Sequence, residues 1–171
     1  MKKIVFSAIL MLISAAAFSQ TGSLPVIMCE LNSGYSIGIN TDSGMQIDVK
    51  GMFLYDRFGV TLEAGSQLTP DKASFHLFLG PGIVVLNTGN WRMPVSIGME
   101  LFHGKTMHYG IGAIVSVHYV ITDLLYAGLN LGLTYAFNNV TEQQKGPAVE
   151  RTDNWGSYLY IRPSLVFGIQ F

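Results

Sequence analysis

The chain has 171 residues, of which 49% are hydrophobic and only 12% are charged. Soluble domains usually carry roughly 25% charged residues, so this composition indicates a membrane protein or an unusually large apolar core. The length favours one domain over two, and the net charge of -1 provides no basic surface for a nucleic-acid partner.

The first residues have the features of a secretory signal peptide. Two lysines precede an apolar run over residues 4–17, and Ala17 and Ser19 are the small residues expected before a cleavage site. The apolar run is shorter than the ~20 residues that a spanning helix needs. We therefore predict that residues 1–19 are removed and that residues 20–171 form a single domain.

Apolar and polar residues alternate along most of the remaining chain. In one segment the first face carries Met45, Ile47, Val49, Phe53 and Tyr55, and the second carries Gln46, Asp48, Lys50, Met52 and Leu54. Successive side chains of a strand point to opposite faces, so this pattern predicts β-strands with one apolar face. Turn signals divide the chain into eight such segments. They lie at about residues 31–40, 44–55, 58–66, 73–86, 91–102, 107–120, 124–138 and 156–171.

The connections between these segments alternate between short and longer ones, the longest being residues 139–154. This is typical of an up-and-down barrel with short periplasmic turns and longer external loops. The predicted fold is therefore all-β, an eight-stranded antiparallel up-and-down transmembrane β-barrel in the outer membrane of a Gram-negative bacterium. Residues 25–30 are expected either to extend the first strand or to cross the periplasmic opening as a plug.

The size of the side chains indicates which face is inside. The polar face is crowded with Gly and Ser, as the narrow interior of an eight-stranded barrel requires, whereas the apolar face carries large residues that suit lipid. The alternative is a soluble lipocalin-like carrier, which has an apolar interior. In the lipid-facing register, six charged residues fall inside and are predicted to form a salt-bridged polar network. They are Asp48, Lys50, Glu63, Arg92, Glu100 and Arg162.

The last segment carries the most specific motif. Leu165, Phe167, Ile169 and the aromatic Phe171 share one face. This pattern resembles the closing-strand signal that the barrel assembly machinery recognises in outer-membrane proteins. The chain as a whole resembles the small OmpA/OmpX-type outer-membrane barrels, and its signal peptide, which ends in Phe-Ser-Gln, is similar to those of Bacteroidetes. The resemblance implies outer-membrane lipid and the assembly machinery as partners.

A structural or interaction role is the predicted function. The barrel would be a rigid mount without an open pore, and its external loops would serve adhesion or envelope integrity. The long connection at residues 138–154 is the main candidate for such contacts. Eight strands leave too little lumen for a continuous aqueous channel, so a narrow pore is a weaker alternative.

An enzyme that modifies lipid A or phospholipid is the remaining alternative. Ser116 and His118 lie two residues apart on the inward face, and Glu100 lies on the neighbouring predicted strand. Acyl hydrolysis would need these groups in contact, yet the inward face is the wrong place for a lipid substrate. No group of His, Cys and carboxylate residues has metal-site spacing. We therefore predict no catalytic, cofactor or metal site.

Overall fold

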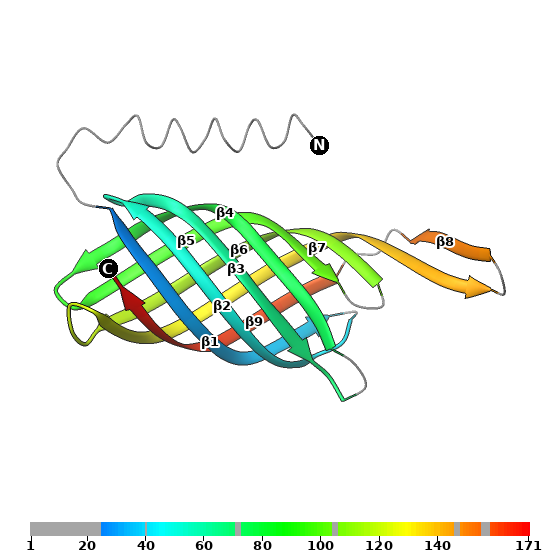
Figure 1. Cartoon of the computed structure of the whole chain (residues 1–171), viewed down its shortest axis with the longest axis horizontal. Coiled ribbons are helices and arrows are strands. Elements are labelled where there is room, and N and C mark those ends of the chain that lie inside the picture. The colour runs from blue at the N-terminus through cyan, green and yellow to red at the C-terminus, as the bar shows by residue number, and fades with distance from the viewer. Residues whose placement is uncertain (1–24, 40, 71–72, 104–105, 146–147, 155–157) are drawn as a thin grey trace.

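The computed structural model describes residues 25–39, 41–70, 73–103, 106–145, 148–154 and 158–171. The described chain is almost entirely β-structure (Figure 1). No helix within it is long and apolar enough to cross a membrane. The strands are β1 (Val26–Ile39), β2 (Gly44–Tyr55), β3 (Phe58–Leu68), β4 (Ala73–Thr88), β5 (Trp91–His103), β6 (Thr106–Val120), β7 (Leu125–Lys145), β8 (Ala148–Asn154) and β9 (Tyr158–Gln170).

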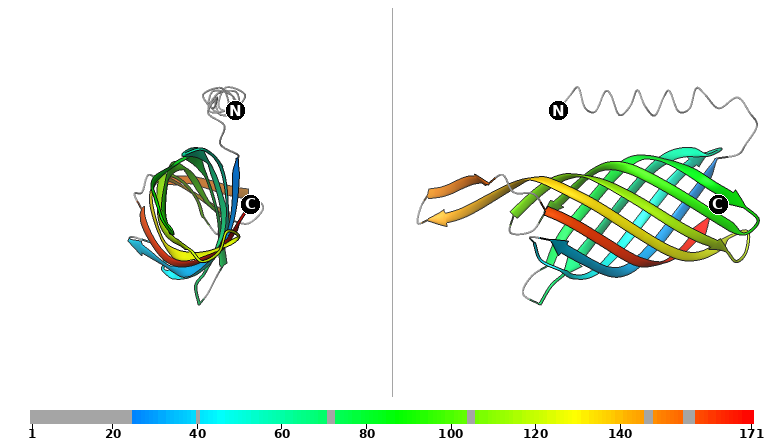
Figure 2. Two further views of the ribbon diagram at one scale, coloured as in Figure 1. Left: turned by 90° about the vertical axis from the view of Figure 1, so that its left-hand side faces the viewer. Right: turned by 180° about the vertical axis from the view of Figure 1, so that it is seen from behind.

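Eight of these strands close into a barrel. Neighbours along the chain pair antiparallel from β1 to β7, β9 pairs with β7, and β9 also pairs with β1. The end-on view shows the resulting ring (Figure 2). Closure leaves no free sheet edge around the ring, so the backbone polar groups are paired within the wall, as a bilayer requires. The predicted fold class is confirmed.

The first strand is longer than the sequence indicated. β1 begins at Val26, so residues 26–30 extend the strand and do not plug the opening. The alternation continues backward from the predicted start, because Glu30 and Met28 are buried while Ile27 and Cys29 are exposed. Of the two alternatives for residues 25–30, the structure shows extension of the first strand, five residues before the approximate start at residue 31.

The long connection predicted at residues 139–154 is not a loop. β7 runs on to Lys145, and β8 pairs with it from Asn139 opposite Asn154 to Lys145 opposite Ala148. This hairpin continues the barrel wall beyond the rim (Figures 1 and 2). The prediction failed because these residues are mostly polar and their few apolar residues do not alternate with them.

At the opposite end of the barrel the turns are tight. Asp56 begins the turn between β2 and β3, and Gly89 begins the turn between β4 and β5; both have φ = 55°. Turns of two residues that join twisted strands need such left-handed φ values, which Gly and Asp tolerate best. Val26 and Phe171 lie at this same end. Short turns mark the periplasmic side of outer-membrane barrels, so we refer to this end as periplasmic and to the hairpin end as external.

Large apolar side chains cover the outside of the barrel. They include Leu31, Val49, Leu62, Ile97, Met99, Ile111, Leu129 and Phe167, each about half exposed. The inside carries the buried polar and charged residues, such as Asp48, Lys50 and Arg162. A lipocalin-like carrier would have the opposite arrangement, so that alternative is wrong. An apolar belt around a closed barrel is the arrangement of a protein that spans a bilayer.

Candidate functional site

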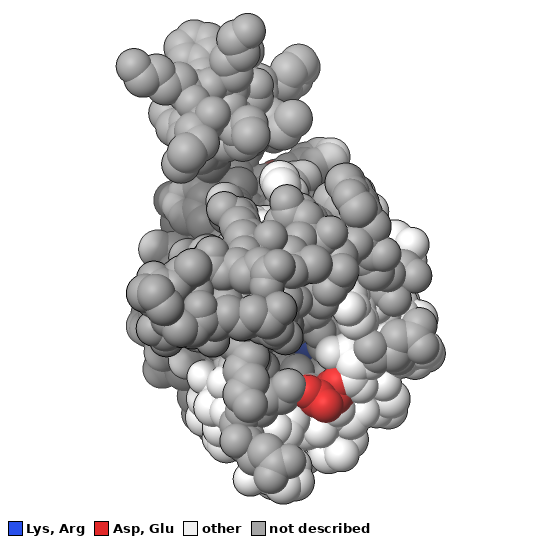
Figure 3. Space-filling model, turned by 90° about the vertical axis from the view of Figure 1, so that its right-hand side faces the viewer, with Lys and Arg blue, Asp and Glu red and all other residues white. Residues whose placement is uncertain are grey.

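The lumen is filled with side chains in three layers. An apolar cluster lies at the periplasmic end, a network of charged and polar residues lies in the middle, and an aromatic cluster lies at the external end. Each layer follows from the inward positions of neighbouring strands, which the antiparallel register places side by side. The external end is viewed in Figure 3, where a small acidic patch lies at the rim of the described surface.

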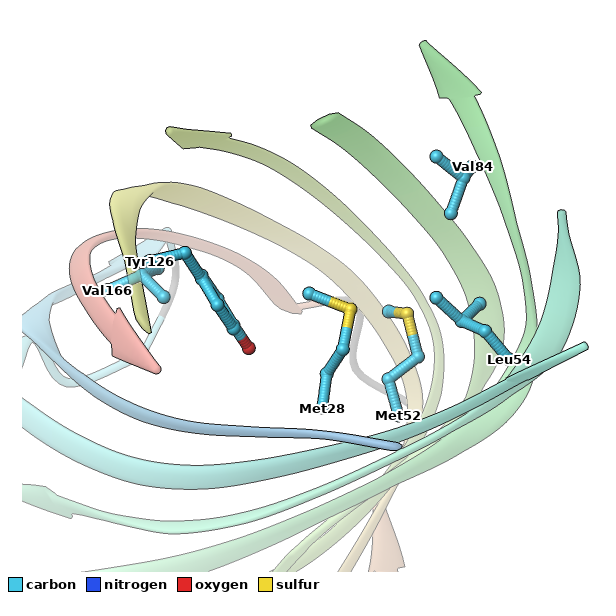
Figure 4. Packing of buried hydrophobic residues seen from close by; sticks show 6 residues of the cluster. All are labelled: Met28, Met52, Leu54, Val84, Tyr126 and Val166. Carbon is cyan, nitrogen blue, oxygen red and sulfur yellow. The ribbon is translucent and has the colours of Figure 1, made fainter. Parts of the chain in front are cut away.

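The apolar cluster closes the periplasmic end. Its buried members are Met28, Met52, Leu54, Val84, Tyr126 and Val166, which come from five strands and point into the lumen (Figure 4). Tyr126 is fully buried and lies over Gly168, its cross-strand neighbour on β9. A Cβ at Gly168 would lie 2.3 Å from the Tyr126 ring, so the glycine makes room for the aromatic side chain.

We expect Tyr126→Ala to destabilise the barrel by about 3–5 kcal/mol, because the fully buried ring would leave a cavity that its neighbours cannot fill. Denaturant unfolding in detergent would measure the change in the free energy of unfolding. Tyr35→Ala is the matched control, since Tyr35 is 48% exposed on the outward face. A loss for Tyr126→Ala no larger than that of the control would show that the ring does not fill the lumen.

The central network begins with a row of inward residues on four adjacent strands. Asn32 pairs with Asp48, Asp48 with Gly65, and Gly65 with His76. Gly65 leaves a gap in this row, through which His76 Nε2 approaches Asp48 Oδ1 to 2.6 Å. The carboxylate and the imidazole therefore meet across an intervening strand.

Arg162 is the hub of the network. Its Nη2 lies 2.7 Å from Glu100 Oε1, and its Nη1 lies 3.4 Å from Glu63 Oε1. Nη2 also donates to Thr134 Oγ1 at 3.2 Å, and Thr134 in turn donates to Glu100. These contacts join β3, β5, β7 and β9 across the lumen, so one side chain connects opposite walls of the barrel.

A second group of charges lies between Arg162 and the apolar cluster. Lys50 Nζ lies 2.7 Å from Glu30 Oε2 and donates to Ser116 Oγ at 2.9 Å. Ser116 donates to Asn130 Oδ1 at 2.9 Å, and His118 Nε2 lies 3.3 Å from Glu30 Oε1. The Ser116 hydroxyl thus bonds to Lys50 and Asn130, not to His118.

The external layer is aromatic. Phe102 stacks on Tyr160 with ring centroids 4.2 Å apart, and it also stacks on His76, with 5.5 Å between the centroids. The Arg162 guanidinium lies 5.6 Å from the Phe102 centroid, within reach of a cation–π contact. His108 packs edge-on against Tyr158 at 4.7 Å. These rings cover the charged network on its external side.

The structure separates the six charged residues proposed for the lumen. Asp48, Glu63, Glu100 and Arg162 belong to the group around Arg162, whereas Lys50 belongs to the group around Glu30. Arg92 is half-buried near the periplasmic end, where it donates to Gln170 and lies opposite His118 in the register, at the edge of the group around Glu30. Sequence reasoning missed Glu30 because it started the first strand one residue too late to include this side chain.

The proposed assembly motif lies on β9 and just beyond it. Leu165, Phe167 and Phe171 are exposed on the outward face, and Ile169 is half-buried. Among the catalytic candidates, Ser116 and His118 are buried in the second charged group and Glu100 is bound to Arg162. The described residues therefore do not bring this serine, histidine and carboxylate together as a catalytic unit.

Known structures share this fold. The N-terminal β-barrel domain of OprF from Pseudomonas aeruginosa superimposes with a TM-score of 0.60 at 13% identity, over 85% of this chain and 97% of that one. A major outer membrane protein of Thermus thermophilus gives 0.56 at 12% identity, over 87% and 100%. Neisserial surface protein A gives 0.54 at 8% identity, over 86% and 97%. The sequence matches no protein-family model and no curated protein.

By fold, the chain is an eight-stranded antiparallel β-barrel like those of the compared outer-membrane proteins. The likeness covers nearly the whole of each compared barrel, and the apolar belt described above is the lipid-facing surface that this fold presents. The localisation is accordingly the outer membrane of a Gram-negative cell. The narrower resemblance to Bacteroidetes proteins stays a prediction.

Proposed function

We propose that the protein is a closed outer-membrane barrel that serves as a rigid mount and presents the β7–β8 hairpin outside the cell, in a structural or adhesive role. The observation that carries this proposal is the continuation of the wall strand β7 into the hairpin. A strand that is continuous with the barrel holds the hairpin in a defined direction, unlike a loop joined at two flexible ends.

The filled lumen supports a role at the surface over a role in transport. Apolar, charged and aromatic layers follow one another along the axis, and the inward residues that form them are buried. An aqueous path would require these ion pairs to separate in a region of low dielectric constant, which is costly. Planar-bilayer recordings should accordingly show no conductance above background, and steady channel openings would favour the pore.

A chain in which residues 140–153 are replaced by Asn-Gly tests the role of the hairpin. We expect this variant to keep the heat-shifted migration of a folded barrel, because β6 and β9 still pair with β7 up to residues 139 and 136. In adhesion and detergent-sensitivity assays it should behave like a strain that lacks the gene. The matched control shortens the β3–β4 connection at residues 69–72 and should behave like wild type.

Two results would argue against this role. If the hairpin variant is folded and equals wild type in both assays, the hairpin has no role in adhesion or in envelope integrity. If lipid A from cells with and without the gene differs in its acylation when analysed by mass spectrometry, a lipid-modifying enzyme becomes the better account.

During biogenesis, we further propose that the outward face of β9, including Leu165 and Phe167, is recognised by the barrel assembly machinery.

A further inference from the structure

The buried charges of the lumen do not balance. Among the described residues, the buried carboxylates are Glu30, Asp48, Glu63 and Glu100, whereas the buried lysine and arginine side chains are Lys50 and Arg162. Lys50 pairs with Glu30, which leaves Arg162 as the permanent cation beside the other three carboxylates. Buried charge without compensation is costly. The group around Arg162 therefore needs additional positive charge.

Three side chains of this group are arranged as metal ligands are. The carboxylates of Asp48 and Glu63 and the imidazole of His76 each offer a ligand atom, and these atoms all lie within 4.8 Å of one another. They come from the three adjacent strands β2, β3 and β4, and all three side chains are buried. A set of one imidazole and two carboxylates suits a divalent transition-metal ion such as Zn²⁺.

The space for these atoms exists because residue 65 is glycine. A Cβ built at Gly65 would lie 1.9 Å from Asp48 Oδ1 and 2.6 Å from His76 Nε2. Any other residue at position 65 would thus occupy the volume in which the two ligand atoms meet. Gly65 thus leaves the space between an acidic and a histidine side chain in one cross-strand row.

The surroundings of His76 allow it to be oriented as a ligand. Its Nδ1 lies 3.0 Å from Glu100 Oε1 and 2.6 Å from Arg162 Nη1. When Nδ1–H donates to Glu100 and Arg162 Nη1 draws back from its close contact with this nitrogen, the Nε2 lone pair faces Asp48. Metal-bound histidines are commonly held by a carboxylate in this way. When Nδ1 instead accepts from Arg162, Nε2 carries the proton and donates to Asp48. Binding of a metal ion at Nε2 selects the first arrangement.

Two buried amides lie against the same carboxylates. Asn32 Nδ2 is 3.4 Å from Glu63 Oε2, and Gln46 donates to Asp48. The oxygens of both amides, Asn32 Oδ1 and Gln46 Oε1, are buried and lack a hydrogen-bond partner. Rotation of either amide by 180° would direct its oxygen toward the carboxylates. That exchange is favourable if a cation lies between them, because the amide oxygens would then also become ligands.

We propose that Asp48, Glu63 and His76 form a binding site for a divalent transition-metal ion within the lumen. The ion supplies the two positive charges that Glu63 and Asp48 lack, while Arg162 stays paired with Glu100. It also ties β2, β3 and β4 together on the wall opposite Arg162. This inference is independent of the role assigned to the hairpin. Protonation of His76 and of one carboxyl group is the competing way to balance the charge, and the experiment distinguishes the two.

The test uses the untagged chain, because a histidine tag would itself bind metal. The barrel is refolded in detergent with excess Zn²⁺, freed of loose metal by gel filtration, and analysed for zinc by atomic emission. We expect about one Zn²⁺ per folded chain. His76→Gln and Gly65→Ala should reduce this content to background. His118→Gln is the matched control, since His118 is equally buried but contacts Glu30 in the other charged group, and it should retain the metal.

Two outcomes would overturn the proposal: wild type that binds no more zinc than His76→Gln, or a loss of zinc in His118→Gln as large as in His76→Gln. The first would leave a network balanced by protons alone. Heat-shifted migration confirms that each variant is folded. If the His76 and Gly65 variants fail to fold, the site is tested instead by adding Co²⁺ to the wild-type protein. A visible ligand-field spectrum that Zn²⁺ abolishes supports the site, and its absence contradicts the site.

Discussion

Replacing Arg162 by methionine is expected to lower the free energy of unfolding by about 3–5 kcal/mol, because the change leaves Glu63 and Glu100 buried without their shared cation. Methionine keeps an unbranched apolar stem but removes the guanidinium, including its contact with the Phe102 ring, so the loss reports the charged group and its contacts. Denaturant-induced unfolding in detergent, followed by tryptophan fluorescence, measures the effect.

Two further variants separate charge from packing at this position. Arg57→Met removes an exposed arginine from the β2–β3 turn and should change stability by less than about 0.5 kcal/mol. The double variant Arg162→Met with Glu100→Gln should recover part of the loss, since it removes one of the unpaired carboxylates. If Arg162→Met and Arg57→Met have equal effects, Arg162 is not the hub of a buried network.

An arginine placed on the lipid-facing surface should be nearly as damaging. Ile97 lies midway along β5 and is 59% exposed on the outward face. If that face contacts hydrocarbon, Ile97→Arg will cost about 2–4 kcal/mol, the range found for basic residues at the midplane of a bilayer. Unfolding in lipid vesicles is the appropriate measurement, because a detergent micelle can deform around the charge.

Leu124→Arg provides the comparison for this substitution. Leu124 is also exposed, but it lies in the β6–β7 turn at the periplasmic end. There the same change should cost no more than about 1 kcal/mol, because a side chain at the interface reaches water. Equal costs at the two positions would mean that the apolar belt is not in the bilayer. A soluble barrel would tolerate arginine at both exposed positions.

The fold was predictable because the burial of each strand residue, toward lipid or toward the lumen, produces a regular alternation in the sequence. Alternation along strands such as β2 and β5 distinguishes lipid-facing from inward residues, and the size difference between the two faces orients the barrel. Where that pattern is missing, the prediction failed. The β7–β8 hairpin runs beyond residue 141, where β7 no longer pairs with β6, and its residues show no regular alternation of apolar and polar types.

The interior contacts could not be predicted in the same way. Which charge meets which depends on the register and tilt of strands that are distant in the sequence, as for Arg162 and Glu63, 99 residues apart. The role of Gly65 shows the difficulty most clearly. Its inward position follows from alternation, but the gap it leaves is visible only when Asp48 and His76 are placed on either side. The spacing of Asp48, Glu63 and His76 along the sequence therefore did not indicate a metal site.

Migration of the full chain from isolated outer membranes on a detergent gel, with and without boiling, tests the central claim most directly. A closed barrel in the outer membrane predicts a compact, faster-migrating band before boiling and a slower band after it. A soluble periplasmic protein that shows no heat shift would contradict the claim that the apolar face of this barrel contacts lipid.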